Sequence, residues 1–184
     1  MGRKPATYAD LEALPPHVVG ELIAGKLHVS PRPAAPHALA SSRLGGELLG
    51  PFDRGRDGPG GWLIYDEPEL HFGEDVLVPD LAGWRRERMP HPPRTVAFTL
   101  APDWVCEVLS PSTAVLDRAL KLPVYAREAV RHVWLLDPEL RTLEVFRLEG
   151  AQYTLLVTHA GTSRVRAEPF ESFELELAYL WGET

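Results

Sequence analysis

The chain has 184 residues, 45% hydrophobic and 24% charged, which suits one folded domain with a sizeable core. Its formal net charge of −7 at pH 7 argues against sequence-blind binding of nucleic acid over the whole surface. The single cysteine, Cys106, excludes an internal disulfide framework and a cysteine-rich zinc site, and predicts a cytoplasmic location. We expect no membrane span, because no apolar run reaches roughly 18 residues, and residues 1–16 lack the apolar stretch of a secretory signal.

The N-terminal third predicts two helices around a hairpin. Residues 7–14 favour a short helix that Thr7 would cap and a Pro-Pro pair would stop. In residues 17–31, apolar stretches flank an Ala-Gly pair, which indicates a strand hairpin. Residues 37–50 repeat apolar side chains at helical spacing despite two internal glycines, so we expect a second helix there.

The middle of the chain predicts strands joined by one long helix. The predicted strands are 62–65, 69–72, 76–84, 104–110 and 131–137. A helix would begin at Ser110-Pro111, break or kink at Pro123 and run to about residue 128. Residues 142–148 and 153–158 alternate and predict an antiparallel hairpin, and FELELAYLW near the end predicts a short helix.

This order predicts an α/β fold with a mixed sheet flanked by helices and antiparallel hairpins at both ends. The central strands are continuously apolar, as in a sheet covered on both faces, and the long helix suits a parallel crossover. We expect a single domain over residues 1–184. Within it, 37–137 would form the core, 1–36 an N-terminal helix and hairpin, and 138–184 a C-terminal hairpin and helix.

Two acids interrupt the apolar strands: Asp80 in VLVPDLAGW and Glu107 in WVCEVLS. A buried unpaired carboxylate is costly, so such an acid shifts its pKa, finds a partner or binds a metal. Because side chains alternate along a strand, the two acids can converge if their strands are neighbours. Pro79 cannot donate a ladder hydrogen bond, so the chain would open beside Asp80. Two carboxylates without zinc-type partners favour Mg²⁺ or Mn²⁺, which bind phosphate oxygens and activate water.

The predicted crossover helix supplies a lysine for such a site. Asp117 and Lys121 are four residues apart and share a helix face, and Lys121 also lies near Arg118. A lysine beside the metal would orient or deprotonate the attacking water, or neutralise charge in the transition state.

Together these residues resemble the Uma-type restriction endonuclease family, a branch of the PD-(D/E)XK nuclease superfamily with the restriction-endonuclease-like fold. The resemblance covers most of the chain and is carried by Pro79-Asp80, EVLSPST at 107–113, Asp117, Lys121 through Tyr125, GELIAG at 20–25, Ser30-Pro31 with His37, and HVWLLDPELRTLEVFRL. It implies a Mg²⁺- or Mn²⁺-dependent endodeoxyribonuclease that hydrolyses DNA, with residues 37–137 as its nuclease core. The resemblance also implies metal ligands Asp80 and Glu107, the active-site lysine Lys121 and a further acid, Glu21. A homodimer is expected by analogy with other enzymes of this fold.

The sequence departs from the superfamily pattern at one position. In (D/E)XK the lysine stands two residues after the acid, and Leu109 occupies that position here. The lysine role would pass to Lys121 on the helix, an arrangement that the Uma-type branch shares.

Simpler interpretations exist for each residue. Asp80 could be an ordinary strand-end aspartate, and Glu107 could form a buried ion pair with Arg85 or Arg118. Lys121 could be a solvated helix lysine paired with Asp117, and Glu21 could face solvent.

His37 could contact substrate phosphate or sit near the site, or it could be a helix-start residue with a local hydrogen bond. The arginines that could grip phosphates, or simply be solvated, are Arg85, Arg86, Arg88 and Arg118. For the whole chain, the main alternative is an inactive nucleic-acid- or protein-binding module on the same fold. A two-carboxylate glycoside hydrolase is a third hypothesis, although nothing else in the chain suggests a sugar cleft.

Overall fold

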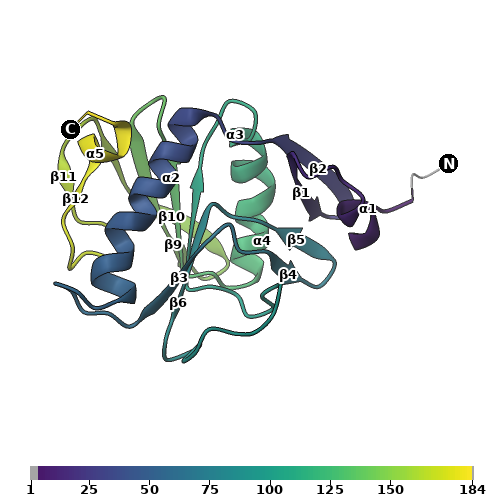
Figure 1. Ribbon diagram of the computed structural model, residues 1–184, viewed down its shortest axis with the longest axis horizontal. Helices are drawn as coiled ribbons and strands as arrows, with labels where there is room; N and C mark the ends of the chain where they lie inside the picture. Colours follow the sequence, from purple (N-terminus) through teal and green to yellow (C-terminus); the bar gives the residue numbers. More distant parts are fainter. Residues whose placement is uncertain (1–3, 184) are drawn as a thin grey trace.

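The computed structural model describes residues 4–183, which form two main sheets with flanking helices (Figure 1). The helical elements are α1 (Tyr8–Glu12), α2 (Ala35–Leu48), η1 (Leu49–Asp53), α3 (Ala114–Leu116), η2 (Asp117–Lys121), α4 (Leu122–Arg127) and α5 (Leu177–Trp181), η1 and η2 being π-helical turns. The strands are β1 (Val18–Ile23), β2 (Lys26–Pro31), β3 (Trp62–Asp66), β4 (Leu70–Phe72), β5 (Asp75–Leu77), β6 (Leu81–Arg85), β7 (Trp104–Val108), β8 (His132–Asp137), β9 (Thr142–Glu149), β10 (Gln152–Ala160), β11 (Arg164–Val165) and β12 (Leu175–Glu176). Within the described part of the chain, no helix has both the length and the apolar character that a membrane crossing requires.

The larger sheet has six strands in the order β10-β9-β8-β7-β6-β3. Only β7 and β8 run parallel within it, and the segment α3–η2–α4 connects them. A parallel pair needs such a crossover, whereas antiparallel neighbours can be joined by short turns. The predicted mixed α/β sheet, its parallel crossover and the β9–β10 hairpin are therefore confirmed.

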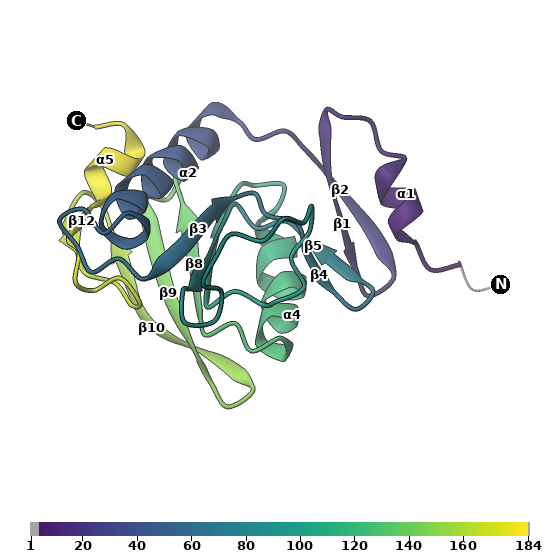
Figure 2. The same cartoon turned by 60° about the horizontal axis from the view of Figure 1, so that its bottom comes forward.

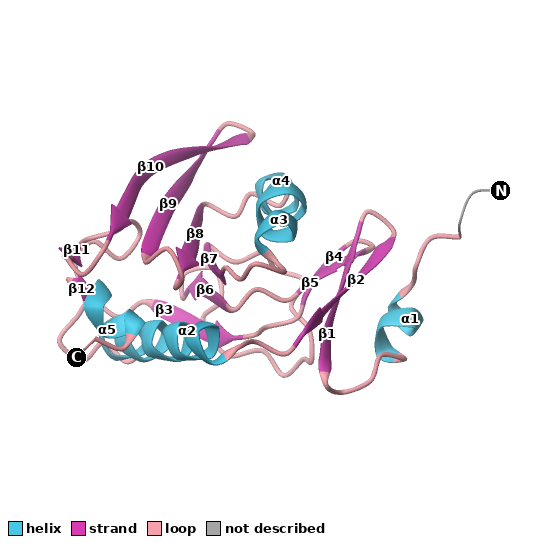
Figure 3. Cartoon of the chain, turned by 90° about the horizontal axis from the view of Figure 1, so that it is seen from above, coloured by secondary structure: helices cyan, strands magenta, loops and turns pink. Residues whose placement is uncertain are grey.

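Helices cover both faces of the larger sheet (Figure 3). On one face, Trp104 and Cys106 of β7 belong to a core that includes residues of α2 and α5. On the other, Val105 belongs to a core that includes Val124 and Tyr125 of α4. Because side chains alternate along β7, this division aims Glu107 toward the crossover helix, buried on the α4 side.

The smaller sheet has the order β2-β1-β5-β4 and lies beside the crossover helix (Figures 1 and 2). Its β1–β2 hairpin turns at Ala24 and Gly25, whose φ angles of 51° and 71° suit a tight two-residue turn. This hairpin was expected, but its pairing with β5 was not. That pairing aligns Leu22 with Val76 and holds Glu21 next to the chain that leads to Asp80.

The prediction of one strand over residues 76–84 is wrong. Its first part forms β5 in the smaller sheet, and its second part forms β6 in the larger sheet. The break falls at Pro79, which has no N–H for a sheet ladder, and the N–H of Val78 donates to the Glu21 carboxylate at 2.8 Å. Asp80 therefore lies between two sheets, at the entrance of β6.

Two helix boundaries also differ from prediction. The crossover helix begins at Ala114 instead of at Ser110-Pro111, because residues 111–113 form turns. Pro123 causes no break: it lies in the first turn of α4, directly after the wide π-helical turn η2, where its missing N–H is tolerated. Near the end of the chain, β12 takes up part of the predicted helix.

Substitution of Gly83 tests the packing of the larger sheet. A Cβ at this position in β6 would lie 3.2 Å from ring atoms of both Trp62 and Trp104, which are buried. Gly83→Ala should therefore lower the free energy of unfolding in urea by about 1–3 kcal/mol, as overpacking typically does. Gly46→Ala is the matched control, because Gly46 lies in α2 with open space around it and should gain about 0.5–1 kcal/mol. Equal stability of the two variants would contradict this account.

Candidate active site

A cleft of about 280 Å³ is lined by the smaller sheet, the start of α2, the end of β7 and the turn η2. The residues predicted from sequence that line it are Glu21, His37, Asp80, Glu107, Asp117 and Lys121. They come from parts of the chain separated by more than half its length. The fold therefore gathers the predicted acids and the predicted lysine around one space.

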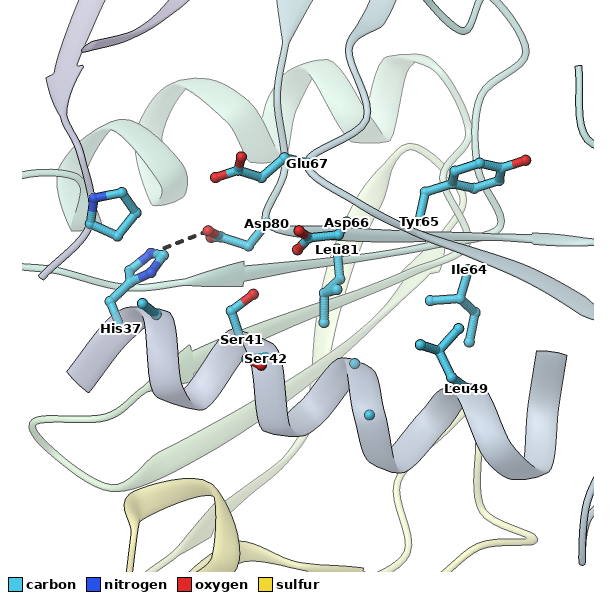
Figure 4. Close-up of a pocket in the computed structure, with 14 residues that line it drawn as sticks. His37, Ser41, Ser42, Leu49, Ile64, Tyr65, Asp66, Glu67, Asp80 and Leu81 are labelled. Atoms are coloured by element: carbon cyan, nitrogen blue, oxygen red, sulfur yellow. Dashed lines mark ion pairs between the residues drawn. The ribbon is translucent and has the colours of Figure 1, made fainter. Parts of the chain in front are cut away.

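Asp80 is held at the entrance of β6 by two contacts. Its Oδ2 accepts a hydrogen bond from the Val108 N–H at 2.7 Å, and its Oδ1 lies 3.2 Å from His37 Nε2 (Figure 4). Because Leu81 pairs with Cys106, the strand register brings Asp80 beside Glu107. The partner of His37 is this distant aspartate and not a local group of its helix.

Asp80 also alters the titration of His37. Burial of the imidazole disfavours its charged form, but the hydrogen bond and the charge of Asp80 outweigh burial and raise the pKa of His37. A protonated His37 would keep the Asp80 carboxylate facing the cleft.

Glu107 is almost completely buried and lies against the crossover helix. Both of its carboxylate oxygens are 2.8 Å from Lys121 Nζ, and its Oε1 accepts a hydrogen bond from the Tyr125 hydroxyl at 2.5 Å. Burial raises the pKa of Glu107, the Lys121 ammonium opposes this, and neighbouring carboxylates add to the rise. The alternative of an ion pair with Arg85 or Arg118 is wrong, because Lys121 is the partner.

Lys121 is 2% exposed and is surrounded by carboxylates. Besides Glu107, its Nζ lies 2.9 Å from Glu21 Oε1 and 3.6 Å from Asp117 Oδ1. Burial disfavours the ammonium form, but these three carboxylates outweigh burial and raise the pKa of Lys121 well above its usual value. The alternatives of a solvated Lys121 and a solvent-facing Glu21 are therefore wrong, since both side chains are buried in the site.

The donor atoms of the cleft suit a hard divalent cation. Five carboxylates line it together with one lysine, those of Glu21, Glu67, Asp80, Glu107 and Asp117, and the only cysteine lies outside the lining. Among residues 4–183, no three His, Cys, Asp or Glu side chains stand close enough to hold an ion by themselves. Mg²⁺ is usually held by one or two carboxylates plus water and substrate phosphates, so Asp80 and Glu107 fit Mg²⁺ or Mn²⁺ better than zinc.

The arginines proposed from sequence lie away from this cleft. Arg85 ends β6 at the opposite end from Asp80, and its guanidinium stacks 4.5 Å from the Trp62 ring centroid. The other three form ion pairs: Arg86 with Asp53 at 3.1 Å, Arg88 with Asp103 at 2.9 Å, and Arg118 with Glu144. None of the four lines the cleft, so the structure does not bring them to the acids.

Sequence reasoning assigned no role to Tyr125 or Glu67. The position of Tyr125, four residues after Lys121, was an available signal, because residues at that spacing share a helix face. Glu67 lines the cleft and donates its N–H to the Asp80 carbonyl at 3.0 Å. No local pattern predicts that contact, because it depends on how β3 meets β6.

A second hollow of about 320 Å³ extends the cleft along α2 (Figure 4). It shares His37, Glu67 and Asp80 with the first and is bordered by small residues of the helix: Ala38, Ser41, Ser42, Gly45 and Gly46. The small side chains leave room beside the acids for an elongated molecule.

Comparison with known proteins agrees with the fold and places the chain in a family. The family model Uma2, described as "Putative restriction endonuclease", matches residues 5–178, and the chain belongs to this family. A crystal structure of a putative nuclease belonging to DUF820 from Anabaena variabilis ATCC 29413 is similar, with a TM-score of 0.75 and 24% identity over 97% of this chain and 99% of that chain. None of the curated proteins matches. The predicted family and the nuclease-like fold are confirmed, and the family supports a nuclease function in general terms.

Removing Lys121 should expose the cost of the buried acids. Lys121→Met leaves Glu21, Glu107 and Asp117 without their shared ammonium, which should cost about 3–5 kcal/mol of unfolding free energy at pH 8. The folded-state pKa values of Glu107 and Asp117 would then lie above the unfolded ones, so the folded protein binds more protons and the variant gains stability as pH falls from 8 toward 5. Urea denaturation across that range measures both effects. Lys26→Met, at an exposed position, should show neither.

The ionised carboxylate of Asp117 should lower the free energy of unfolding at neutral pH. Burial raises the pKa of Asp117 and outweighs the opposing effects of Lys121 and Thr113. Since folding disfavours the charged form, Asp117→Asn should raise the urea midpoint at pH 7.5. The gain should vanish near pH 3, where the wild-type carboxyl is also neutral. Glu139→Gln, at an exposed position, changes the net charge by the same amount and is the control. An equal rise in its urea midpoint would contradict this interpretation.

Proposed function

We propose that this protein is a Mg²⁺-dependent endonuclease that hydrolyses DNA phosphodiester bonds in the cleft described above. The observation that carries the proposal is the meeting of Asp80 and Glu107, from adjacent strands, with a lysine that three carboxylates hold in a buried position. Family membership and the fold of the Anabaena structure support the same class of activity.

Asp80 and Glu107 are the proposed metal ligands. A bound Mg²⁺ or Mn²⁺ would contact a phosphate oxygen and lower the pKa of an attacking water. Asp80 is kept in place by Val108 and His37, and Glu107 by Tyr125. To take part, Glu107 must turn one oxygen away from Lys121.

Glu21 and Asp117 would keep Lys121 in place when Glu107 turns one oxygen toward the metal. Both contact Lys121 Nζ independently of Glu107, so the ammonium keeps two carboxylate partners when Glu107 turns. Their proposed role is to position Lys121, and Glu21 also accepts the Val78 N–H in the segment that leads to Asp80.

The raised pKa of Lys121 decides between the roles that its position allows. A strongly held ammonium is a poor proton acceptor at neutral pH, so deprotonation of the water by Lys121 is disfavoured. In hydrolysis, the water oxygen bonds to phosphorus while a bond from phosphorus to a deoxyribose oxygen breaks. One proton of the water ends on the leaving deoxyribose oxygen, and negative charge grows on the phosphoryl oxygens. Lys121 is suited to stabilise that charge.

A non-catalytic binding module is the alternative function. It is favoured by one observation: both Glu107 oxygens are already engaged by Lys121 and Tyr125. Titration calorimetry with Mn²⁺ distinguishes the two, because a module of that kind need not take up metal.

Three further expectations from the sequence remain predictions: that the chain is a single domain, that it is located in the cytoplasm, and that it forms a homodimer.

The nuclease proposal predicts metal-dependent cleavage that needs both ligands. Wild-type protein with Mg²⁺ or Mn²⁺ should nick or cut plasmid DNA. Asp80→Asn and Glu107→Gln should each slow cleavage by about 100-fold or more, because the loss of several kcal/mol corresponds to at least two factors of ten. Calorimetry of the same variants should show weakened Mn²⁺ uptake.

The matched control for these variants is Glu87→Gln, which removes an exposed acid beyond the far end of β6. It should cleave like wild type. Undiminished cleavage by Asp80→Asn would mean that another site, or a contaminant, carries the activity.

A further inference from the structure

The cleft is poor in cations for a site that would receive an anionic polymer. Its lining includes five carboxylates, from Glu21, Glu67, Asp80, Glu107 and Asp117. Lys121 and Arg32 are its only lysine and arginine, and Lys121 is already neutralised by its carboxylate partners. A DNA strand carries a negative charge on every phosphate, so a metal ion can compensate only the phosphates closest to it. A further cation next to the acids would compensate a neighbouring phosphate.

Arg32 has the free donors for this role. Its guanidinium donates one hydrogen bond to the Pro16 carbonyl at 3.0 Å and forms no ion pair with any carboxylate of residues 4–183. Burial raises the pKa of Glu67, and the Arg32 charge opposes this from beyond ion-pair distance. A guanidinium has five N–H donors, so most of its donors remain for a ligand.

Eight other arginines lack this freedom. Ion pairs with carboxylates engage Arg86, Arg88, Arg118, Arg127, Arg141, Arg147, Arg164 and Arg166. All of these also lie outside the cleft lining, whereas Arg32 combines an accessible guanidinium with a place in that lining.

The backbone around Arg32 is unusually restricted. Figure 2 shows the segment that passes from β2 to α2. Arg32 stands there between Pro31 and Pro33, and residues 30–34 border the cleft. Proline fixes its own φ and confines the residue before it to extended conformations. Less backbone entropy is therefore lost when Arg32 binds a ligand, and the Pro16 carbonyl further limits the side chain.

We propose that Arg32 binds a DNA backbone phosphate adjacent to the phosphate that is hydrolysed, using the bidentate geometry that guanidinium and phosphate share. This inference rests on the proposed nuclease function and adds the residue that recognises the strand beside the metal ligands. In this proposal Arg32 takes the phosphate-binding role that sequence alone suggested for Arg85, Arg86, Arg88 and Arg118.

The test measures DNA binding separately from cleavage. The affinity of a fluorescein-labelled 20-base-pair duplex is followed by anisotropy from 50 to 200 mM KCl, with Ca²⁺ as the divalent ion and a gel to verify intact DNA. Arg32→Gln should weaken binding about tenfold and flatten the slope of log K against log[salt] by about one. Arg32→Lys should keep the wild-type slope and recover only part of the affinity, because an ammonium lacks the planar fork.

Arg94→Gln is the matched control, because it removes one exposed arginine from the connection between β6 and β7, outside the cleft. Its slope and affinity should equal those of wild type, and the urea midpoints of all variants should agree. If Arg32→Gln and Arg94→Gln behave alike while wild type binds and cleaves DNA, the role of Arg32 is refuted and the nuclease function stands. If wild type neither binds nor cleaves DNA, the nuclease proposal fails first and the Arg32 proposal fails with it.

Discussion

The buried contact between Lys121 and Glu107 is the interaction on which the site depends. It ties the crossover helix to the central strand β7 and, through Glu21, to the smaller sheet. Without an ammonium at this point, three acids would be buried together at a cost of several kcal/mol. The same ammonium makes a carboxylate-rich cleft compatible with a stable fold, and the surplus of acids is what supports the proposal of a divalent cation there.

The architecture explains how these groups meet. The parallel pair β7–β8 requires a crossover, and the crossover carries Lys121 and Tyr125 over the face of β7 where Glu107 points. The break at Pro79 sends the chain from one sheet into the other and leaves Asp80 at the junction. Each sheet thus supplies acids to a space that neither could enclose alone, while the proline-bounded segment at Arg32 closes one side.

The sequence predicted structure correctly where interactions between residues close along the chain decide it. Apolar runs and alternation predicted the mixed sheet, the burial of both faces of β7 and the hairpin at Ala24-Gly25, because these follow from backbone geometry and burial. Asp80 and Glu107 were identifiable because ionised groups in apolar strands are costly unless they have a partner. Lys121 was indicated by its helical spacing from Asp117 and by the family resemblance. Sequence erred at residues 76–84, where a continuous apolar pattern conceals a change of sheet. It also gave no sign that Arg86, Arg88 and Arg118 have carboxylate partners distant along the chain.

The sequence by itself determined the α/β class, the alternation that buries Glu107 and the spacing that puts Asp117, Lys121 and Tyr125 on one helix face. Only the tertiary structure decided the rest: that Glu21 and Lys121 touch, that His37 contacts Asp80, and that Arg32 reaches the cleft without a carboxylate partner among residues 4–183. The physical reason is the distance along the chain over which the deciding interactions act. Periodicity reports whether a residue faces solvent or the core, whereas the partner of a buried charge is chosen by how separate elements dock.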